Sequence, residues 1–143
     1  TRYLMKLPII SLFIAASITS FSVSESPALA ADKSAGKSFF KICSACHSLE
    51  INMHKVGPSL AKLFGRHAGT VSGFQRYSSH MKKAGNKGLI WSEELLLQYL
   101  ANPKQFLRDF LSDPSARTSM TFAGIRKKKD RENLLEYLLE ATR

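Results

Sequence analysis

The stretch Cys43-Ser44-Ala45-Cys46-His47 contains both cysteines of the 143-residue chain, followed directly by one of its four histidines. A disulfide between residues three apart would close only a tiny loop and would tie no distant segments together. On a helical turn, however, positions i and i+3 lie on the same face, so two thiols and an imidazole are presented together. We therefore expect the fold to be built around what these three side chains hold.

The spacing C-x-x-C-H is the pattern through which haem c is attached covalently. The thiols of Cys43 and Cys46 can reach the two vinyl-derived carbons on one edge of the porphyrin, and His47 then lies under the iron as an axial ligand. A thioredoxin-like redox pair would need a βαβ context, and a zinc site would need more Cys or His residues nearby. The sequence shows neither.

Residues 1–30 are predicted to be a secretory signal peptide. Two basic residues precede an apolar run over 7–21, and Ala28-Leu29-Ala30 supplies small residues at a cleavage spacing. The run is short for a membrane span, which needs about 20 apolar residues. Cleavage leaves one domain over 31–143 in the periplasm, whereas a retained run would make the protein membrane-anchored.

The remaining chain is strongly basic. Without Arg2, Lys6 and Glu25, residues 31–143 carry 19 basic and 10 acidic side chains. This balance favours acidic partners, and export makes nucleic acid the weakest of them, so none is expected. The run Arg126-Lys127-Lys128-Lys129 is either a solvated helix start or a docking site. Four adjacent cations oppose the dipole at a helix N-terminus, so a stability role is not expected.

Hydrophobic periodicity predicts an all-α chain with short helices and long loops. Helices are expected from about 34 to 43, from 93 to 101, from 104 to 111, and from about 130 onward. Ser92 is the expected cap of the second, and Asn102-Pro103 separates it from the third. Residues 48–88 lack a sustained hydrophobic period and are predicted to form loops with short helical turns. The regular segments are too few to fill a core without a bulky cofactor.

A second axial ligand has to come from the other methionines and histidines. Met53 and His54 follow His47 too closely for the chain to cross to the other face of the macrocycle. Met120 lies 73 residues beyond His47, in an irregular segment that can arch over it. Its position alone is compatible with two roles for Met120, either an axial ligand of the haem iron or a side chain that fills the core. The remaining candidates are Met81, His67 and His80, with His80 the leading one among the histidines.

The chain after residue 30 resembles class I cytochrome c, particularly the bacterial cytochrome c2 and mitochondrial-like branch, over almost its whole length. The matching stretches are Gly36 to His47, His54-Lys55-Val56-Gly57-Pro58-Ser59-Leu60, Leu63-Phe64-Gly65-Arg66, Gly88-Leu89-Ile90-Trp91, Tyr99-Leu100-Ala101-Asn102-Pro103, Met120-Thr121-Phe122-Ala123-Gly124-Ile125 and Arg126 to Leu138.

The resemblance implies a ligand set. Met120 is then the second axial ligand, and its thioether favours ferrous iron and raises the potential. Pro58 offers its carbonyl to the other ring nitrogen of His47 and fixes the orientation of that ring. Tyr99 and Thr118 lie near the Met120 sulfur or the inner haem propionate.

The same resemblance implies a propionate site and a docking edge. Arg66, Tyr77 and Trp91 occupy positions at which the family holds the haem propionates by hydrogen bonds. Phe122 covers the exposed haem edge. Lys55 and the basic run 126–129 flank that edge and orient the protein toward an acidic docking site.

Two features depart from the family pattern. The stretch from Phe106 to Thr118 is several residues longer than in the commonest members, so its route to Met120 is not the standard one. Ser119 stands where lysine is usual, which removes one cation beside the haem edge.

The function implied is soluble, monomeric one-electron outer-sphere transfer between membrane complexes. The donor would be a cytochrome bc1 complex and the acceptor a terminal oxidase or a photosynthetic reaction centre. No nucleophile–base pair suggests an enzyme. Two alternatives remain: a membrane-tethered cytochrome module, if 1–30 is retained, and a haem peroxidase in which Met120 is weakly held.

Cleavage after Ala28-Leu29-Ala30 predicts a mature protein that begins at Ala31. The intact mass of protein isolated from the periplasm should equal residues 31–143 plus one haem. A mass that includes the apolar run 7–21 would instead support the membrane-anchored alternative.

Overall fold

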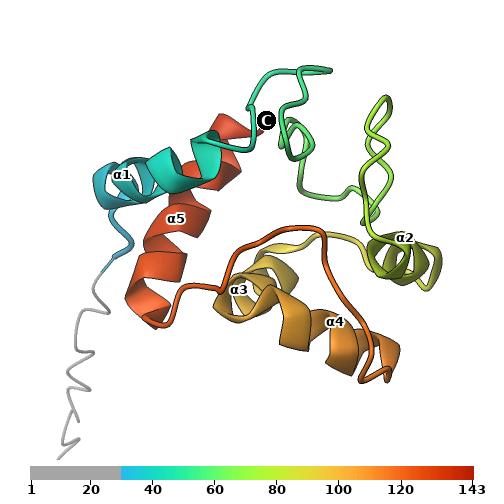
Figure 1. The fold of residues 1–143 in the computed structure, drawn as a ribbon. Helices are drawn as coiled ribbons and strands as arrows, with labels where there is room; N and C mark the ends of the chain where they lie inside the picture. The colour runs from blue at the N-terminus through green and yellow to red at the C-terminus, as the bar shows by residue number, and fades with distance from the viewer. Residues whose placement is uncertain (1–29) are drawn as a thin grey trace, which may run out of the picture.

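The computed structural model describes residues 30–143, which form five helices joined by long loops (Figure 1). The helices are α1 (Lys33–Ser44), α2 (Ser79–Asn86), α3 (Glu93–Ala101), α4 (Pro103–Leu111) and α5 (Lys128–Ala141). Within this range the only extended pairing is one isolated bridge between His67 and Ile90. None of the described helices is long and apolar enough to cross a membrane. All but the last residue of the predicted signal peptide lies outside the described range.

Side-chain caps explain why three helices begin where the sequence predicts. The Asp32 carboxylate accepts hydrogen bonds from the first backbone N–H groups of α1. The Ser92 hydroxyl accepts from Leu95 N at 3.2 Å at the start of α3. Asn102 ends α3 and caps α4, accepting from Gln105 N at 3.1 Å, with Pro103 at the first position of α4. These caps are local in sequence and so are readable from it.

Two boundaries differ from the sequence prediction. Residues 79–86 form a regular helix, α2, where loops with short turns were expected. Ser78 caps it, and Met81, Ala84 and Gly85 form its buried face. Helix α5 begins at Lys128, two residues before the predicted start, with no side-chain cap at its N-terminus. Tertiary packing stabilises the uncapped start of α5, whereas the Ser78 cap of α2 is a local signal that the sequence prediction missed.

Helix α1 crosses α5 at a point of very close backbone approach (Figure 1). A Cβ atom on Gly36 would lie 1.9 Å from the Asn133 carbonyl oxygen. Beside this contact the rings of Phe40 and Tyr137 pack with centroids 5.4 Å apart. The backbone N–H of Asp32 donates to the Asn133 side chain at 2.8 Å. Glycine is therefore required for α1 to reach α5.

An ordered turn follows α4 on the way to Met120. Helix α4 ends at Leu111, and the next residue, Ser112, has a left-handed φ of 50°. Asp113 then accepts hydrogen bonds from the backbone and hydroxyl of Ser115, and lies 3.8 Å from His80 and 3.9 Å from Lys83 on α2. Residues 112–115 thus form an ordered turn that contacts α2.

We predict that Gly36→Ala destabilises the haem-containing protein by about 2 kcal/mol or more, because the added methyl group forces two backbones apart. The free energy of unfolding by guanidinium chloride measures this. Ser38→Ala is the matched control, since Ser38 is exposed on the same helix. Equal unfolding midpoints for the two variants would contradict the close approach.

Candidate functional site

The Cys43–His47 segment closes the C-terminal end of α1 as a tight turn. The backbone N–H groups of Cys46 and His47 both donate to the Cys43 carbonyl, at 3.0 and 2.9 Å. Both thiols are free, with Cys43 partly buried and Cys46 exposed. Burial raises the pKa of the Cys43 thiol, and the nearby Cys46 raises it further. A catalytic redox pair needs a lowered thiol pKa, so this environment does not favour one.

His47 is held in one tautomer. Its Nδ1 lies 2.7 Å from the Pro58 carbonyl oxygen. A carbonyl only accepts, so Nδ1 carries the proton and the lone pair of Nε2 is free to bind a metal. Burial lowers the pKa of His47, opposed by the hydrogen bond to Pro58 and assisted by the cations of Arg66 and Lys55. The neutral imidazole, which is the ligating form, is therefore favoured.

Gly57 forms the cradle of the His47 ring. A Cβ atom on Gly57 would lie 2.5 Å from His47 Cε1 and 2.9 Å from Nε2. The Gly57 N–H donates to the Cys46 carbonyl at 2.8 Å, and Lys55 Nζ donates to the Ser44 carbonyl at 2.6 Å. Residues 55–58 are thus folded directly onto the turn. Two thiols, one oriented imidazole and a cradle without a side chain fit a covalently attached haem.

The other candidates for the second axial position are engaged or distant. Both ring nitrogens of His54 are used, since Nε2 contacts the Ser72 carbonyl at 2.8 Å and Nδ1 accepts from Ser59 N at 3.1 Å. Met81 is buried in the core on α2, and Met53 is exposed. His67 Nδ1 lies 3.3 Å from the Gly85 carbonyl. His80 faces Asp113.

Met120 lies in a segment anchored on both sides. Its backbone N–H donates to Thr118 Oγ1 at 3.1 Å, and its partly buried side chain packs against the core. Four residues later Gly124 has a φ of 103° and approaches the Ala101 carbonyl so closely that a Cβ would lie 2.1 Å away. Ile125 N then donates to Leu100 O at 2.8 Å. The end of α3 therefore sets the position of this segment.

Tyr99 connects this segment to the interior. The Tyr99 hydroxyl hydrogen bonds the Thr118 side chain. Burial is the main cause that raises the pKa of Tyr99 to about 12; the hydrogen bond to Thr118 lowers this pKa and the nearby Tyr77 raises it. Tyr99 is thus a neutral hydrogen-bonding group, and Thr118 links it to the Met120 backbone.

Arg66 lies near both Trp91 and Tyr77, the other two residues predicted to hold the haem propionates. The backbone N–H of Trp91 donates to the backbone carbonyl of Arg66 at 3.0 Å. The Trp91 ring packs edge-on against Tyr99, with ring centroids 4.9 Å apart. Burial raises the pKa of Tyr77, while the Arg66 cation lowers it. Arg66 donates to the Ala61 carbonyl at 2.8 Å. Because this hydrogen bond uses part of the Arg66 guanidinium, the positive charge of Arg66 is held in place at this site.

The remaining predicted residues, Phe122, Lys55 and the basic run, do not lie together. Phe122 is partly buried and packs against the core. Lys55 lies against the haem-bearing turn through Ser44. At the end of the basic run, Lys129 Nζ donates to the Ala30 carbonyl at 2.9 Å, and Lys128 Nζ lies 3.4 Å from Glu132. Lys55 and Lys129 are therefore found near opposite ends of α1.

Sequence reasoning assigned no role to Gly57 or Ser59. Ser59 is 1% exposed, and its carbonyl accepts from Arg66 at 3.2 Å while its N–H binds His54. It joins the loop that carries Pro58 to the predicted propionate residue Arg66. The only sequence signal was the position of both residues beside Pro58, because every contact that reveals their roles is distant in sequence.

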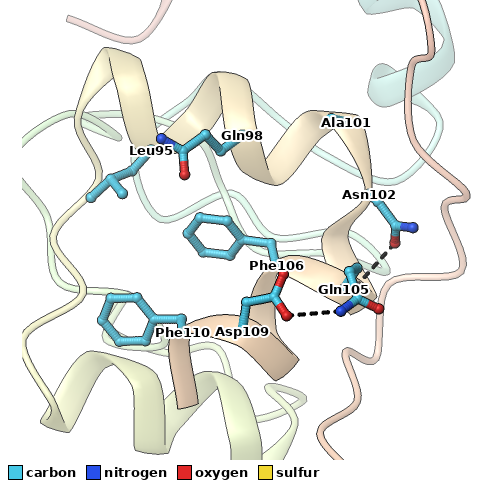
Figure 2. A pocket seen from close by; sticks show the side chains of 8 residues that line it. All are labelled: Leu95, Gln98, Ala101, Asn102, Gln105, Phe106, Asp109 and Phe110. Carbon is cyan, nitrogen blue, oxygen red and sulfur yellow. Dashed lines mark hydrogen bonds between the residues drawn. The ribbon is translucent and has the colours of Figure 1, made fainter. Parts of the chain in front are cut away.

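A surface hollow of about 260 Å³ lies between α3 and α4 (Figure 2). Its lining contains no residue of the 43–47 turn. Phe106 and Phe110 form an apolar side of it and stack with centroids 6.1 Å apart. Phe106 also stacks on Trp91 at 6.3 Å. The hollow is thus the outer side of the aromatic cluster around Trp91.

Comparison with known proteins places the chain in a family. It is 40% identical over 115 residues to a cytochrome c2 of Rhodovulum adriaticum, covering 75% of this chain and 90% of that one. The identity to a cytochrome c2 iso-2 of Magnetospirillum molischianum is 42% over 108 residues, covering 76% and 96%. The chain belongs to the cytochrome c2 family. A scan against protein-family models finds no match.

Solved structures of the family agree. A cytochrome c2 from Rhodobacter sphaeroides superposes with a TM-score of 0.73 at 36% identity, covering 78% of this chain and 97% of that one. The cytochrome c2 of Rhodospirillum centenum gives 0.72 at 34% identity, covering 78% and 99%. The predicted all-α, single-domain class I cytochrome c fold is confirmed. Proteins of this family are electron carriers rather than enzymes, and the chain carries one covalently attached haem c.

We predict that Gly57→Ala displaces the His47 ring and breaks its hydrogen bond to Pro58. In the reduced holoprotein the His47 Nδ1 proton should lose its protection from exchange in NMR spectra. The protein should also be destabilised by about 1–3 kcal/mol, as for overpacking in a core. Val56→Ala is the control, because it changes an exposed neighbour and adds no atom at the ring. If the Nδ1 proton is equally protected in both variants, the close packing of Gly57 against the His47 ring is contradicted.

Proposed function

We propose that this protein is a soluble periplasmic electron carrier between membrane complexes, with its haem held by the Cys43–His47 turn. The observation that supports this most directly is the 2.7 Å contact of His47 Nδ1 with the Pro58 carbonyl. It leaves Nε2 as the only free ring nitrogen, next to two unpaired thiols. Such an arrangement has no obvious use other than holding a metal-bearing group at the end of α1.

In this proposal Cys43 and Cys46 form the thioether bonds, and His47 and Met120 are the axial ligands. When bound, the haem iron supplies a one-electron couple, whose potential a methionine ligand raises. The chain's own contribution is to hold both ligands still. His47 is fixed by Pro58 and Gly57, and the Met120 backbone is fixed by Thr118.

The cluster of Arg66, Tyr77 and Trp91 is proposed to hold the haem propionates. A buried carboxylate is costly unless it is paired and hydrogen-bonded. Arg66 supplies the charge, and the burial that raises the pKa of Tyr77 keeps its hydroxyl protonated as a donor. Tyr99, also neutral, lies between this cluster and Met120 through Trp91 and Thr118.

The proposed donor is a cytochrome bc1 complex, and the acceptor is a terminal oxidase or a reaction centre. Purified holoprotein added to washed membranes of the source bacterium should be reduced when quinol is supplied and reoxidised by oxygen or light. Each molecule should accept one electron in a potentiometric titration. Holoprotein that membranes neither reduce nor oxidise would contradict the proposal.

Met120→Ala should abolish the near-red thioether-to-iron charge-transfer band of the ferric protein and lower the potential, because the sulfur ligand that favours ferrous iron is lost. Visible absorption and a redox titration measure both effects. Met53→Ala is the control, since it removes an exposed methionine. A band retained in Met120→Ala would assign the ligand elsewhere, with Met81 the next candidate.

The basic run should act on association rather than on stability. Replacing Lys127 and Lys128 by Glu should slow electron transfer to an acidic partner at low salt, while the spectrum and potential stay nearly unchanged. The difference should shrink as the Debye length falls from about 30 to 8 Å. Lys37→Glu with Lys87→Glu is the charge-matched control at exposed sites elsewhere. Equal loss in both double variants would mean that only net charge matters.

A further inference from the structure

The turn that follows α4 is folded by its own side chains. The Asp113 N–H donates to the Arg108 carbonyl at 2.9 Å, just after the left-handed residue Ser112. Oδ1 of Asp113 accepts from the Ser115 N–H at 2.9 Å and from the Ser115 hydroxyl at 2.6 Å. The Ala116 N–H then donates to the Asp113 carbonyl at 3.1 Å. The local fold of the turn therefore uses only one carboxylate oxygen of Asp113.

The second carboxylate oxygen of Asp113 faces α2. Oδ2 lies 3.8 Å from Nε2 of His80 and 3.9 Å from Nζ of Lys83. Positions 80 and 83 are three apart and so lie on one face of the helix. The two hydrogen bonds from Ser115 are the main cause that lowers the pKa of Asp113; burial opposes them, and Lys83 and His80 lower this pKa further. Asp113 is thus a carboxylate at neutral pH, with its charge directed at two basic side chains.

Helix α2 is fixed to the core by its opposite face. Met81, Ala84 and Gly85 are its buried residues. At Gly85 the backbone approaches another segment so closely that a Cβ atom would lie 1.9 Å from the Ala68 carbonyl oxygen. A group that pairs with the outer face of α2 is therefore held relative to the core as a whole.

The turn is also the start of the stretch that carries Met120. Met120 lies seven residues after Asp113, and no helix is formed between 112 and 120. Ala116 is fully buried, and the Thr118 hydroxyl accepts from the Met120 N–H at 3.1 Å. Further along, Ile125 is bonded to the end of α3. An irregular stretch with so few backbone hydrogen bonds opens at low free energy, so a restraint at its start changes how often it opens.

We propose that Asp113 is a positioning residue that acts through His80 and Lys83 to hold the stretch 116–120 in place, and so keeps Met120 on the haem iron. The inference rests on the proposed function, because it takes Met120 as the second axial ligand. It gives a role to the part of the chain that departs from the commonest family members. A contact that only stabilised the fold would act on global unfolding, whereas this one acts on the opening of a single stretch.

Imidazole added to the ferric holoprotein measures this opening, since it binds the iron where Met120 has left it. Asp113→Asn keeps a carbonyl oxygen for Ser115 but removes the charge that faces α2. It should raise the apparent affinity for imidazole about threefold, the size expected when an exposed ion pair is lost. Asp109→Asn is the matched control, because it makes the same change four residues earlier, where the carboxylate contacts Gln105 instead of α2.

Guanidinium chloride separates a local effect from a global one. In Asp113→Asn the near-red charge-transfer band should be lost at a lower concentration than in the wild type, while the midpoint of far-UV circular dichroism stays unchanged. Amide hydrogen exchange of Ala116, which is bonded to the Asp113 carbonyl, should speed up by the same factor of about three, and exchange in α5 should not change.

A double-mutant cycle locates the effect on α2. His80→Gln with Lys83→Gln should raise the apparent affinity for imidazole by the same factor as Asp113→Asn. Combining all three substitutions should add nothing further, because either change alone already removes the contact. Lys82→Gln is the control for the lost positive charge, since Lys82 is an exposed neighbour on the same helix.

The outcomes separate this inference from the wider function. If Asp113→Asn and Asp109→Asn bind imidazole equally, or if the cycle is additive, the role of Asp113 is wrong while Met120 stands as the ligand. If the near-red band and the circular dichroism midpoint shift together, Asp113 only stabilises the fold, and the proposal is likewise overturned. Wild-type ferric protein without a near-red band would overturn the assignment of Met120 itself.

Discussion

At Gly36 the backbone of α1 approaches that of α5 so closely that a methyl group would meet the Asn133 carbonyl oxygen. The position of the haem-bearing turn depends on this contact, because the turn from Cys43 to His47 follows directly from the C-terminal end of α1. Asn133 reinforces the crossing by accepting from the Asp32 backbone with its side chain. The Phe40 and Tyr137 rings fill the space beside it. A helix of 12 residues thus places three functional side chains by being clamped near its other end.

From that fixed turn, the remaining site is assembled by loops, each held by a few backbone contacts. Residues 55–58 fold back onto the turn, and Ser59 continues from them to Arg66. Arg66 is paired through its backbone to Trp91, and Trp91 packs on Tyr99. Thr118 then connects Tyr99 to Met120. His47 and the proposed second ligand Met120 are therefore linked through one continuous set of contacts, although 73 residues separate them.

The parts of the fold that sequence could predict are those whose causes are local. Helix α3 was predicted from its Ser92 cap, α1 from a cap at Asp32 or Ser34, and α4 from Pro103 at its start. Helix α2 was missed although its Ser78 cap is equally local, because the residues around it show no sustained hydrophobic period and its buried face is visible only against the core. The C-x-x-C-H spacing is equally local. The roles of Gly57 and Ser59 were not readable, since each depends on a ring or a guanidinium brought in from elsewhere.

The basic run 126–129, which we propose guides an acidic partner, lies at a distance from the haem-bearing turn. Lys129 is near the start of α1, about one helix length or roughly 18 Å from the haem-bearing turn. Charge acts across such distances by orienting the whole molecule before contact, within the limit set by the Debye length of the medium. For the cations of the run to guide a partner as proposed, they therefore need not lie beside the haem-bearing turn. Their effect on the association rate would then have to weaken as added salt shortens the Debye length.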